Sequence, residues 1–148
     1  MYGRHHIRIA RPSRDLTAAE HFWTEGLGMD VLFRTEAPPG GGDADDDGSD
    51  DDEPYALLMI GWRDAGWHLE LALDPRAPVT PRPTDEDLLV IYLDGPVPDS
   101  LVERLERCGG TRVPARNPYW DRWGVTVQDP DGYRLVLSTR DWAPEGGG

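Results

Sequence analysis

The sequence predicts an α+β fold in which one order of elements occurs twice. Three observations support this prediction. Short apolar segments alternate between an apolar and a polar face, as half-buried strands do. Two longer segments have helical spacing and end at glycines. A stretch with four prolines, residues 74–86, separates two halves that each contain a strand, a helix and three strands, written βαβββ.

The first half begins with an alternating strand over residues 6–12. Asp15 can cap the helix that follows, and Gly26 or Gly28 can end it. Three further strands are predicted in the segments MDVLFRT, YALLMIGW and WHLELAL.

The last of these segments has two chemically different faces. One face is apolar, and its members are Trp67, Leu69, Leu71 and Leu73. The other face carries His68 and Glu70, two residues apart. An imidazole and a carboxylate in so apolar a strand predict that this face is either wet or lines a pocket.

The second half repeats the pattern. A strand is predicted at DLLVIYLDG, and a helix at VPDSLVERLERCGG, with Gly109 or Gly110 as its end. The short strand TRVPAR follows. The last two strands, WGVTVQ and YRLVLST, flank DPDG, in which Asp131 and Gly132 predict a hairpin turn. The tail, residues 140–148, is expected to fray.

Composition limits the classes of function. The 148 residues are enough for one domain with a sizeable core. The net charge is −13, but residues 43–53 hold eight of the 28 acidic residues, and without them the charge is −5. This balance argues against a nucleic-acid partner, which needs clustered positive charge. Cys108 is the only cysteine and excludes an internal disulfide. With no signal-like or membrane-spanning run, we expect a cytoplasmic protein without a membrane partner.

The acidic run lies in an expected loop insert, residues 36–54. Charges of one sign at this density repel one another and stay solvated. The segment Asp43 to Gly48 matches the start of a calcium loop, but Pro54 stands where the closing glutamate belongs. A solvated insert is therefore favoured, and a calcium-responsive interaction module is the third hypothesis for function.

Several motifs in this order resemble the vicinal oxygen chelate superfamily, which includes glyoxalase I, bleomycin-resistance proteins and extradiol dioxygenases. They are IARPSRDLTAAEHFWTEGLGMDVL, WHLELA and NPYWDRWGVTVQDPDGYRLVL. The resemblance covers residues 5–139, and the NPYW segment favours an uncharacterised bacterial branch. It implies two modules, residues 5–73 and 87–139, whose curved mixed sheets surround a central cleft. His68 and Glu70 would then point into the hollow of the first module.

The resemblance also implies where a metal would bind. Metal-using members draw ligands from the first and last strands of each module. Here those positions map to His6 and Glu70 in module one, and to Leu88 and Val136 in module two, which cannot bind a metal. His68 could supply a third ligand. Two of the four ligand positions are therefore missing, and we expect no obligatory metal. Binding of a divalent zinc, nickel, manganese, iron or magnesium ion is kept as an alternative.

Other roles remain open for these polar residues. His6 and His68 could hydrogen-bond within the pocket, and Glu70 could pair with Arg8 on the same strand face. If the protein catalyses a reaction, Glu70 is the candidate general base, since burial can raise the pKa of a carboxyl group.

Module two offers candidate ligand-binding side chains. Tyr92, Tyr119 and Trp120 could form aromatic walls for a flat organic ligand. Arg134 lies on the pocket face of the last strand and could bind a carboxylate or oxyanion. Core packing or dimer contacts are the alternative for Trp120 and for Trp123.

Two hypotheses for the function are favoured. The first is a small-molecule-binding protein of the glyoxalase/bleomycin-resistance type, with an aromatic and polar cleft and a degenerate metal site. The second is a divalent-metal-dependent lyase, isomerase or dioxygenase using His6 and Glu70. We expect a homodimer, whose cleft could lie within one chain or between two.

Overall fold

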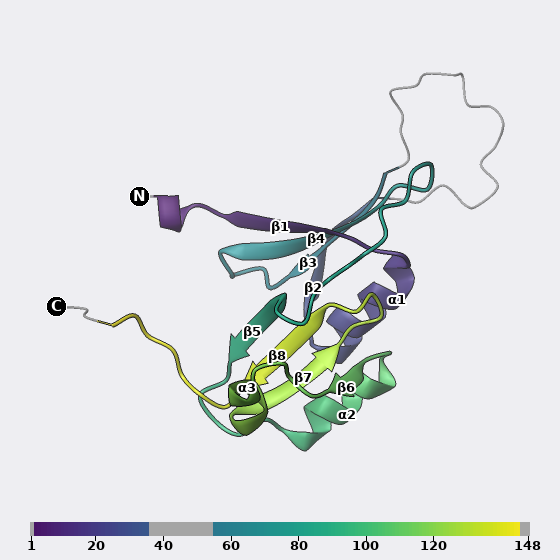
Figure 1. Ribbon diagram of the computed structural model, residues 1–148. Helices are drawn as coiled ribbons and strands as arrows, with labels where there is room; N and C mark the ends of the chain where they lie inside the picture. The colour runs from purple at the N-terminus through teal and green to yellow at the C-terminus, as the bar shows by residue number, and fades with distance from the viewer. Residues whose placement is uncertain (1, 36–54, 146–148) are drawn as a thin grey trace, which may run out of the picture.

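Two four-stranded mixed sheets, one in each half of the chain, form the framework of the protein (Figure 1). The computed structural model describes residues 2–35 and 55–145. The first sheet has the order β1 (Ile7–Pro12), β4 (Trp67–Leu73), β3 (Ala56–Gly61) and β2 (Asp30–Arg34), and the second has the order β5 (Leu88–Tyr92), β8 (Arg134–Ser138), β7 (Gly124–Gln128) and β6 (Thr111–Val113). The first two strands of each order are parallel and the other neighbours antiparallel. The predicted α+β fold of two βαβββ modules is confirmed. The acidic run lies outside the described residues.

Helical segments connect the first strand of each module to the next. In module one, α1 (Leu16–Glu20) continues into a π-helical segment, η2 (His21–Gly26), and in module two α2 (Asp99–Arg107) takes this place. A short 3₁₀ turn, Tyr2–Arg4, precedes β1. Asp15 caps α1 as predicted, because its carboxylate accepts a hydrogen bond from the backbone N–H of Ala18 at 3.0 Å. Gly28 follows η2 with a φ of +95°, the left-handed conformation that favours glycine.

One helix was not predicted from the sequence. Residues 118–122 form α3 (Pro118–Arg122), where the prediction had only a connection leading into a strand. Asn117 caps this helix by accepting a hydrogen bond from the N–H of Tyr119 at 3.0 Å, and Pro118 occupies the first turn. The Asn-Pro pair is the signal that would have revealed it.

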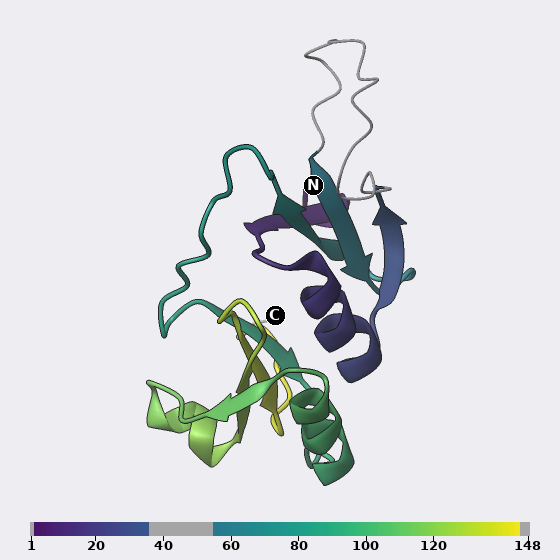
Figure 2. The same ribbon diagram turned by 90° about the vertical axis from the view of Figure 1, so that its right-hand side faces the viewer.

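The core lies between the two sheets and is shared by the modules. Phe22 and Trp23, adjacent in η2, are both fully buried. They belong to one buried cluster with residues from both sheets and from α2, namely Leu58, Ile60, Leu69, Leu71, Leu105, Val127, Leu135 and Leu137. In Figure 2 the purple helical segment (α1 with η2) and the green helix α2 lie on the right-hand side of the view, one above the other. The apolar face predicted for β4 is thus confirmed at Leu69 and Leu71.

The predicted hairpin turn joins the two modules. β7 and β8 pair across it, and Gly132 has a φ of +92°. The Asp131 carboxylate accepts a hydrogen bond from the Ser13 hydroxyl at 2.6 Å, and the Asp129 carboxylate accepts one from the indole N–H of Trp23 at 3.0 Å. Burial raises the pKa of the Asp129 carboxyl to about 6. The turn therefore connects module two to the helical segment of module one through buried carboxylates.

The helical segments themselves approach closely at Gly26. A Cβ placed on Gly26 would lie 3.1 Å from a methyl group of Leu105 and 3.3 Å from the Cβ of Cys108. Arg104 donates a hydrogen bond from Nε to the carbonyl of Gly26 at 2.8 Å. This contact places the end of α2 directly against η2. None of the described helices is long and apolar enough to cross a membrane.

Candidate functional site

A polar cluster occupies the face of the first sheet opposite to the core. β1 and β4 are parallel, and their register pairs Arg8 with His68 and Ala10 with Glu70. The side chains of His6, Arg8, His68 and Glu70 contact one another in this cluster, which we call the module-one cluster. The residues that the sequence placed on one strand face are thereby brought together.

The hydrogen bond from Arg8 constrains the tautomer of His68. Arg8 donates from Nε to Nε2 of His68 at 3.2 Å, so that nitrogen must carry a lone pair. In a neutral His68 the proton then lies on Nδ1, which donates to Nε2 of His6 at 2.5 Å. Burial, and then the neighbouring His6 and Arg8, lower the pKa of His68, while Glu70 acts in the opposite direction. This geometry favours a neutral imidazole at His68.

Arg8 also pairs with Glu70. Its Nη1 lies 3.4 Å from a carboxylate oxygen of Glu70, and its Nη2 lies 3.7 Å from the sulfur of Met59. The Glu70 side chain is 16% exposed and that of Arg8 is 51% exposed. The ion pair considered from the sequence is therefore present, with the guanidinium lying between the imidazole of His68 and the carboxylate.

The strand register identifies the counterpart of Leu88 in module one. On β8, the residue two before Val136 pairs with Leu88. On β4, the residue two before Glu70 pairs with Arg8. Arg8 is thus the register counterpart of Leu88, and His6 lies two residues earlier in the chain, which differs from the equivalence expected from the sequence. The four equivalent positions are then Arg8, Glu70, Leu88 and Val136. Of these, only Glu70 has a side chain that can bind a metal.

The donor atoms around His6 and Glu70 are already engaged with other side chains. An ion between His6 and Glu70 would meet the guanidinium of Arg8, which is always charged and occupies a lone pair on each neighbour. The nearest imidazole nitrogens of His6 and His68 are joined to each other instead. As these side chains stand, they do not fit a divalent metal.

An apolar pocket adjoins the module-one cluster on the same strands. Its volume is about 240 Å³, and its lining includes Ala10, Pro12, Tyr55, Ala72 and Val79. Ala10 is the register partner of Glu70 on the neighbouring strand. Polar groups that can orient a ligand therefore lie beside a surface that can bury its apolar part. Sequence reasoning missed this pocket, because Tyr55 and Val79 reach it from loops.

The aromatic residues predicted in module two gather around α3. The rings of Tyr119 and Trp120 pack edge to face, with centroids 5.0 Å apart, and the Tyr92 ring lies 6.4 Å from that of Trp120. Trp123 instead contacts the guanidinium groups of Arg122 and Arg140, each of which lies over its ring. The three predicted wall residues are thus neighbours, and α3 positions two of them.

Arg134 is engaged within the chain. It is 8% exposed and donates to the carboxylate of Asp85 at 3.0 Å and to the carbonyl of Pro114 at 3.2 Å. Nearby on this face, the hydroxyl of Thr126, the register partner of Val136, is buried without a hydrogen-bond partner. In the part of the chain that the structure describes, no hydrogen bond, ion pair or ring contact joins this region to the module-one cluster.

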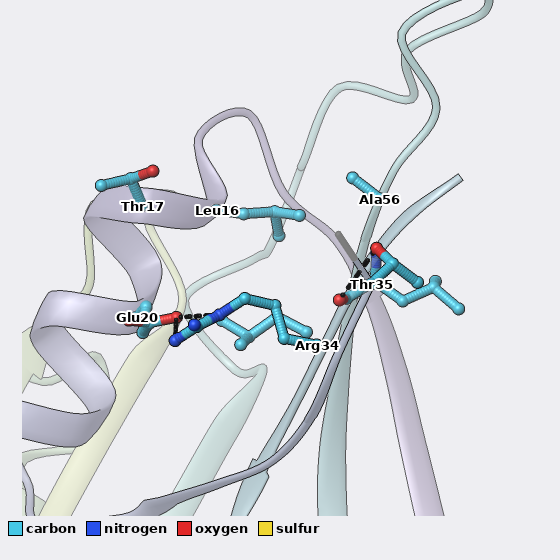
Figure 3. Close-up of a pocket in the computed structure, with 8 residues that line it drawn as sticks. Leu16, Thr17, Glu20, Arg34, Thr35 and Ala56 are labelled. Atoms are coloured by element: carbon cyan, nitrogen blue, oxygen red, sulfur yellow. Dashed lines mark hydrogen bonds and ion pairs between the residues drawn. The ribbon is translucent and has the colours of Figure 1, made fainter. Parts of the chain in front are cut away.

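A second pocket lies on the core side of the first sheet, between α1 and the ends of β2 and β3. Its volume is about 330 Å³. Figure 3 shows Glu20 and Arg34 pointing toward each other across it, and Arg34 Nε lies 2.9 Å from the carboxylate. No residue of the module-one cluster lines this pocket.

The chain is similar to known proteins in sequence and in structure. Residues 86–139 match the YycE-like C-terminal domain. The chain is 33% identical to the uncharacterized protein YycE of Bacillus subtilis (strain 168) over 132 residues, covering 88% of this chain and 85% of that protein.

Solved structures show the same fold. A crystal structure of a Bacillus subtilis YycE protein of unknown function, described as a candidate glyoxalase/fosfomycin resistance protein, matches with a TM-score of 0.74 and 29% identity over 97% of this chain and 95% of the other. Glyoxalase I of Leishmania major matches with a TM-score of 0.61 and 20% identity, covering 88% and 83% of the two chains. TnmS3, an antibiotic-binding protein from Streptomyces sp. CB03234, matches with 0.54 and 23%, covering 93% and 96%.

Proposed function

Because the chain belongs to the YycE family, within the vicinal oxygen chelate superfamily, we propose that it binds a small organic molecule at the module-one cluster without an obligatory metal ion. The description of the Bacillus protein as a candidate glyoxalase/fosfomycin resistance protein agrees with a small-molecule ligand. The geometry of the first sheet carries the proposal.

The observation that supports this proposal is that a fixed polar group and an apolar pocket are neighbours along the same two strands. Arg8 is held by His68 and Glu70, yet half of its side chain is exposed. The pocket around Ala10 and Ala72 begins at the next residue pair of the same two strands. A ligand with an apolar body would fill that pocket, and its polar end would meet Arg8, whose orientation is already set.

A metal-dependent lyase, isomerase or dioxygenase is the rival. It is favoured only by the nearness of His6, His68 and Glu70. Such an enzyme would require the Arg8 guanidinium to leave its position and Glu70 to act as ligand or base. A divalent ion would then polarise a substrate oxygen.

We also propose that the protein is a homodimer. β1 and β5 are edge strands, and apolar side chains on or near them are exposed, with Ile7 at 52%, Ile9 at 39% and Tyr92 at 38%. Exposed apolar edge strands are sites at which chains associate. A second copy could bring its aromatic residues to the module-one cluster. Light scattering should give twice the monomer mass for the native chain and a monomer for Ile9→Lys.

A thermal-shift screen tests the binding proposal. Aromatic carboxylic acids, cationic amine drugs and polycyclic aromatic antibiotics are the probes, because binding to the native state raises its melting temperature. A probe that stabilises the native protein should lose its effect in Arg8→Ala and in Ala72→Phe, which fills the pocket. It should keep its effect in the control Arg107→Ala, which alters an exposed arginine of α2, and after chelator treatment.

Two outcomes would contradict the proposal. In the first, no probe shifts the melting temperature of the native protein. In the second, a shift persists in both Arg8→Ala and Ala72→Phe. A shift that disappears on chelation, and returns with a divalent ion, would favour the metal-dependent rival.

A further inference from the structure

A second group of metal-ligating side chains lies at the junction of the two modules. His21, Glu25 and Cys108 each offer one ligand atom, and these three atoms all lie within 4.8 Å of one another. No other trio of histidine, cysteine or acidic residues meets this condition within residues 2–35 and 55–145. The group shares no residue with the module-one cluster.

The fold brings the three side chains together from distant parts of the sequence. His21 and Glu25 are four residues apart on η2, and Nδ1 of His21 lies 3.1 Å from a carboxylate oxygen of Glu25. Cys108 caps the C-terminus of α2, where the close approach at Gly26 sets its Cβ against η2. The thiol is buried, with 7% exposure, while His21 and Glu25 are open to solvent. An ion could therefore enter from the surface and meet the sulfur at the base of the site.

The spacing and the donor types fit one class of ion. Zinc binds sulfur, nitrogen and oxygen at about 2.0–2.3 Å in tetrahedral geometry, which places ligand atoms roughly 3.3–3.6 Å apart. The separation of His21 and Glu25 is close to this range, and the sulfur of Cys108 lies within 4.8 Å of both of their ligand atoms. A thiolate with an imidazole selects zinc and similar transition metals over magnesium or calcium.

We infer that His21, Glu25 and Cys108 bind a zinc-like transition-metal ion that links module one to module two. Three protein ligands leave a fourth position for water. Coordination displaces the thiol proton, and the bound ion adds a connection between η2 and α2 beside the hydrogen bond from Arg104 to Gly26.

A histidine–glutamate pair alone would be an ordinary surface ion pair that contributes little. Two features distinguish this one. The buried thiol comes from the other module, and the pair lies on a π-helical segment, a local geometry often found at functional sites.

Cobalt titration of the full chain tests the inference, because cobalt replaces zinc and a cobalt–thiolate bond gives a charge-transfer band in the near ultraviolet. Carboxylates alone, including those of residues 43–53, cannot produce this band. We expect one cobalt per chain with the band in the native protein, and its loss in Cys108→Ser. The double variant His21→Gln/Glu25→Gln should weaken cobalt binding more than about tenfold, since even indirect support of a metal ligand has effects of that size.

Two control variants separate this site from other histidines and acids. His5→Gln changes an exposed histidine, and the double variant His6→Gln/Glu70→Gln changes the module-one cluster. Both should keep the band. The exposed positions of His21 and Glu25 keep the test valid if Cys108→Ser does not fold. The inference is overturned if the native protein shows no band at millimolar cobalt, or if the band survives in His21→Gln/Glu25→Gln with unchanged affinity.

Discussion

Replacing Asp129 with asparagine should change how the stability of this protein depends on pH. Asp129 is 5% exposed. Burial raises the pKa of its carboxyl from 3.8 to about 6, with a further contribution from Asp131, against hydrogen bonds from Tyr133 and Trp23 that lower it. The folded protein therefore holds this proton more tightly than the unfolded chain does.

The magnitude follows from the difference between the two pKa values. A difference of about two pKa units corresponds to about 3 kcal/mol, at about 1.36 kcal/mol per unit. This stabilisation is fully present below pH 3.8 and is lost as the pH rises through about 6. About 2 kcal/mol of it falls between pH 4 and pH 7.5.

Asparagine removes the titration but not the whole hydrogen-bond network. Its amide oxygen can still accept from the backbone N–H groups of Asp131 and Tyr133, which lie 2.9 and 2.8 Å from the carboxylate. Its NH₂ group would face the indole N–H of Trp23, and the loss of that bond costs about 1–3 kcal/mol at every pH.

Urea unfolding of the native protein and Asp129→Asn at pH 4 and pH 7.5 is the assay. The difference in free energy of unfolding between the two proteins should move by about 2 kcal/mol toward the variant at the higher pH. The control Asp64→Asn, at an exposed carboxylate, should show no such movement. A difference that is constant with pH, or that moves the other way, would show that the folded protein does not raise the pKa of Asp129.

Three further predictions follow from other contacts. Gly110→Ala should lower the free energy of unfolding by about 1–3 kcal/mol, because the new Cβ would lie 2.7 Å from a backbone oxygen. The control Gly95→Ala should be nearly neutral, because its Cβ would meet nothing within 4 Å. Equal effects of the two substitutions would contradict this prediction. Arg8→Gln should raise the pKa of His68, since it removes a neighbouring cation; an unchanged or lower pKa in an NMR titration of the imidazole would disprove this. Asn117→Ala should destabilise α3 by about 1 kcal/mol in denaturant unfolding, and Asn117→Asp should retain the cap; equal losses in both would argue against capping.

Local signals in the sequence were enough for most of the fold. The cap at Asp15, the Asp131–Gly132 turn and the alternating faces of β4 depend on neighbours in the chain, and the structure confirms each of them. The helix α3 was missed because it is only five residues long, and its Asn-Pro signal was interpreted as a connection.

The candidate site could be predicted only in part. Alternation placed Glu70 and His68 on one face, but it does not fix the register between β1 and β4, which are about sixty residues apart in the chain. That register places Arg8, rather than His6, opposite His68. The partner of Arg134 comes from the proline-rich linker, whose path has no periodic pattern to predict it. Contacts made by loops, or between strands far apart in the chain, could therefore not be predicted from the sequence.

An anomalous-scattering map from a crystal soaked in zinc would distinguish a metal-free ligand site at the module-one cluster from a metal centre. We expect no ion within bonding distance of His6 and Glu70, with the Arg8 guanidinium still lying between His68 and Glu70. A zinc peak bonded to His6 and Glu70, with Arg8 displaced, would contradict this expectation.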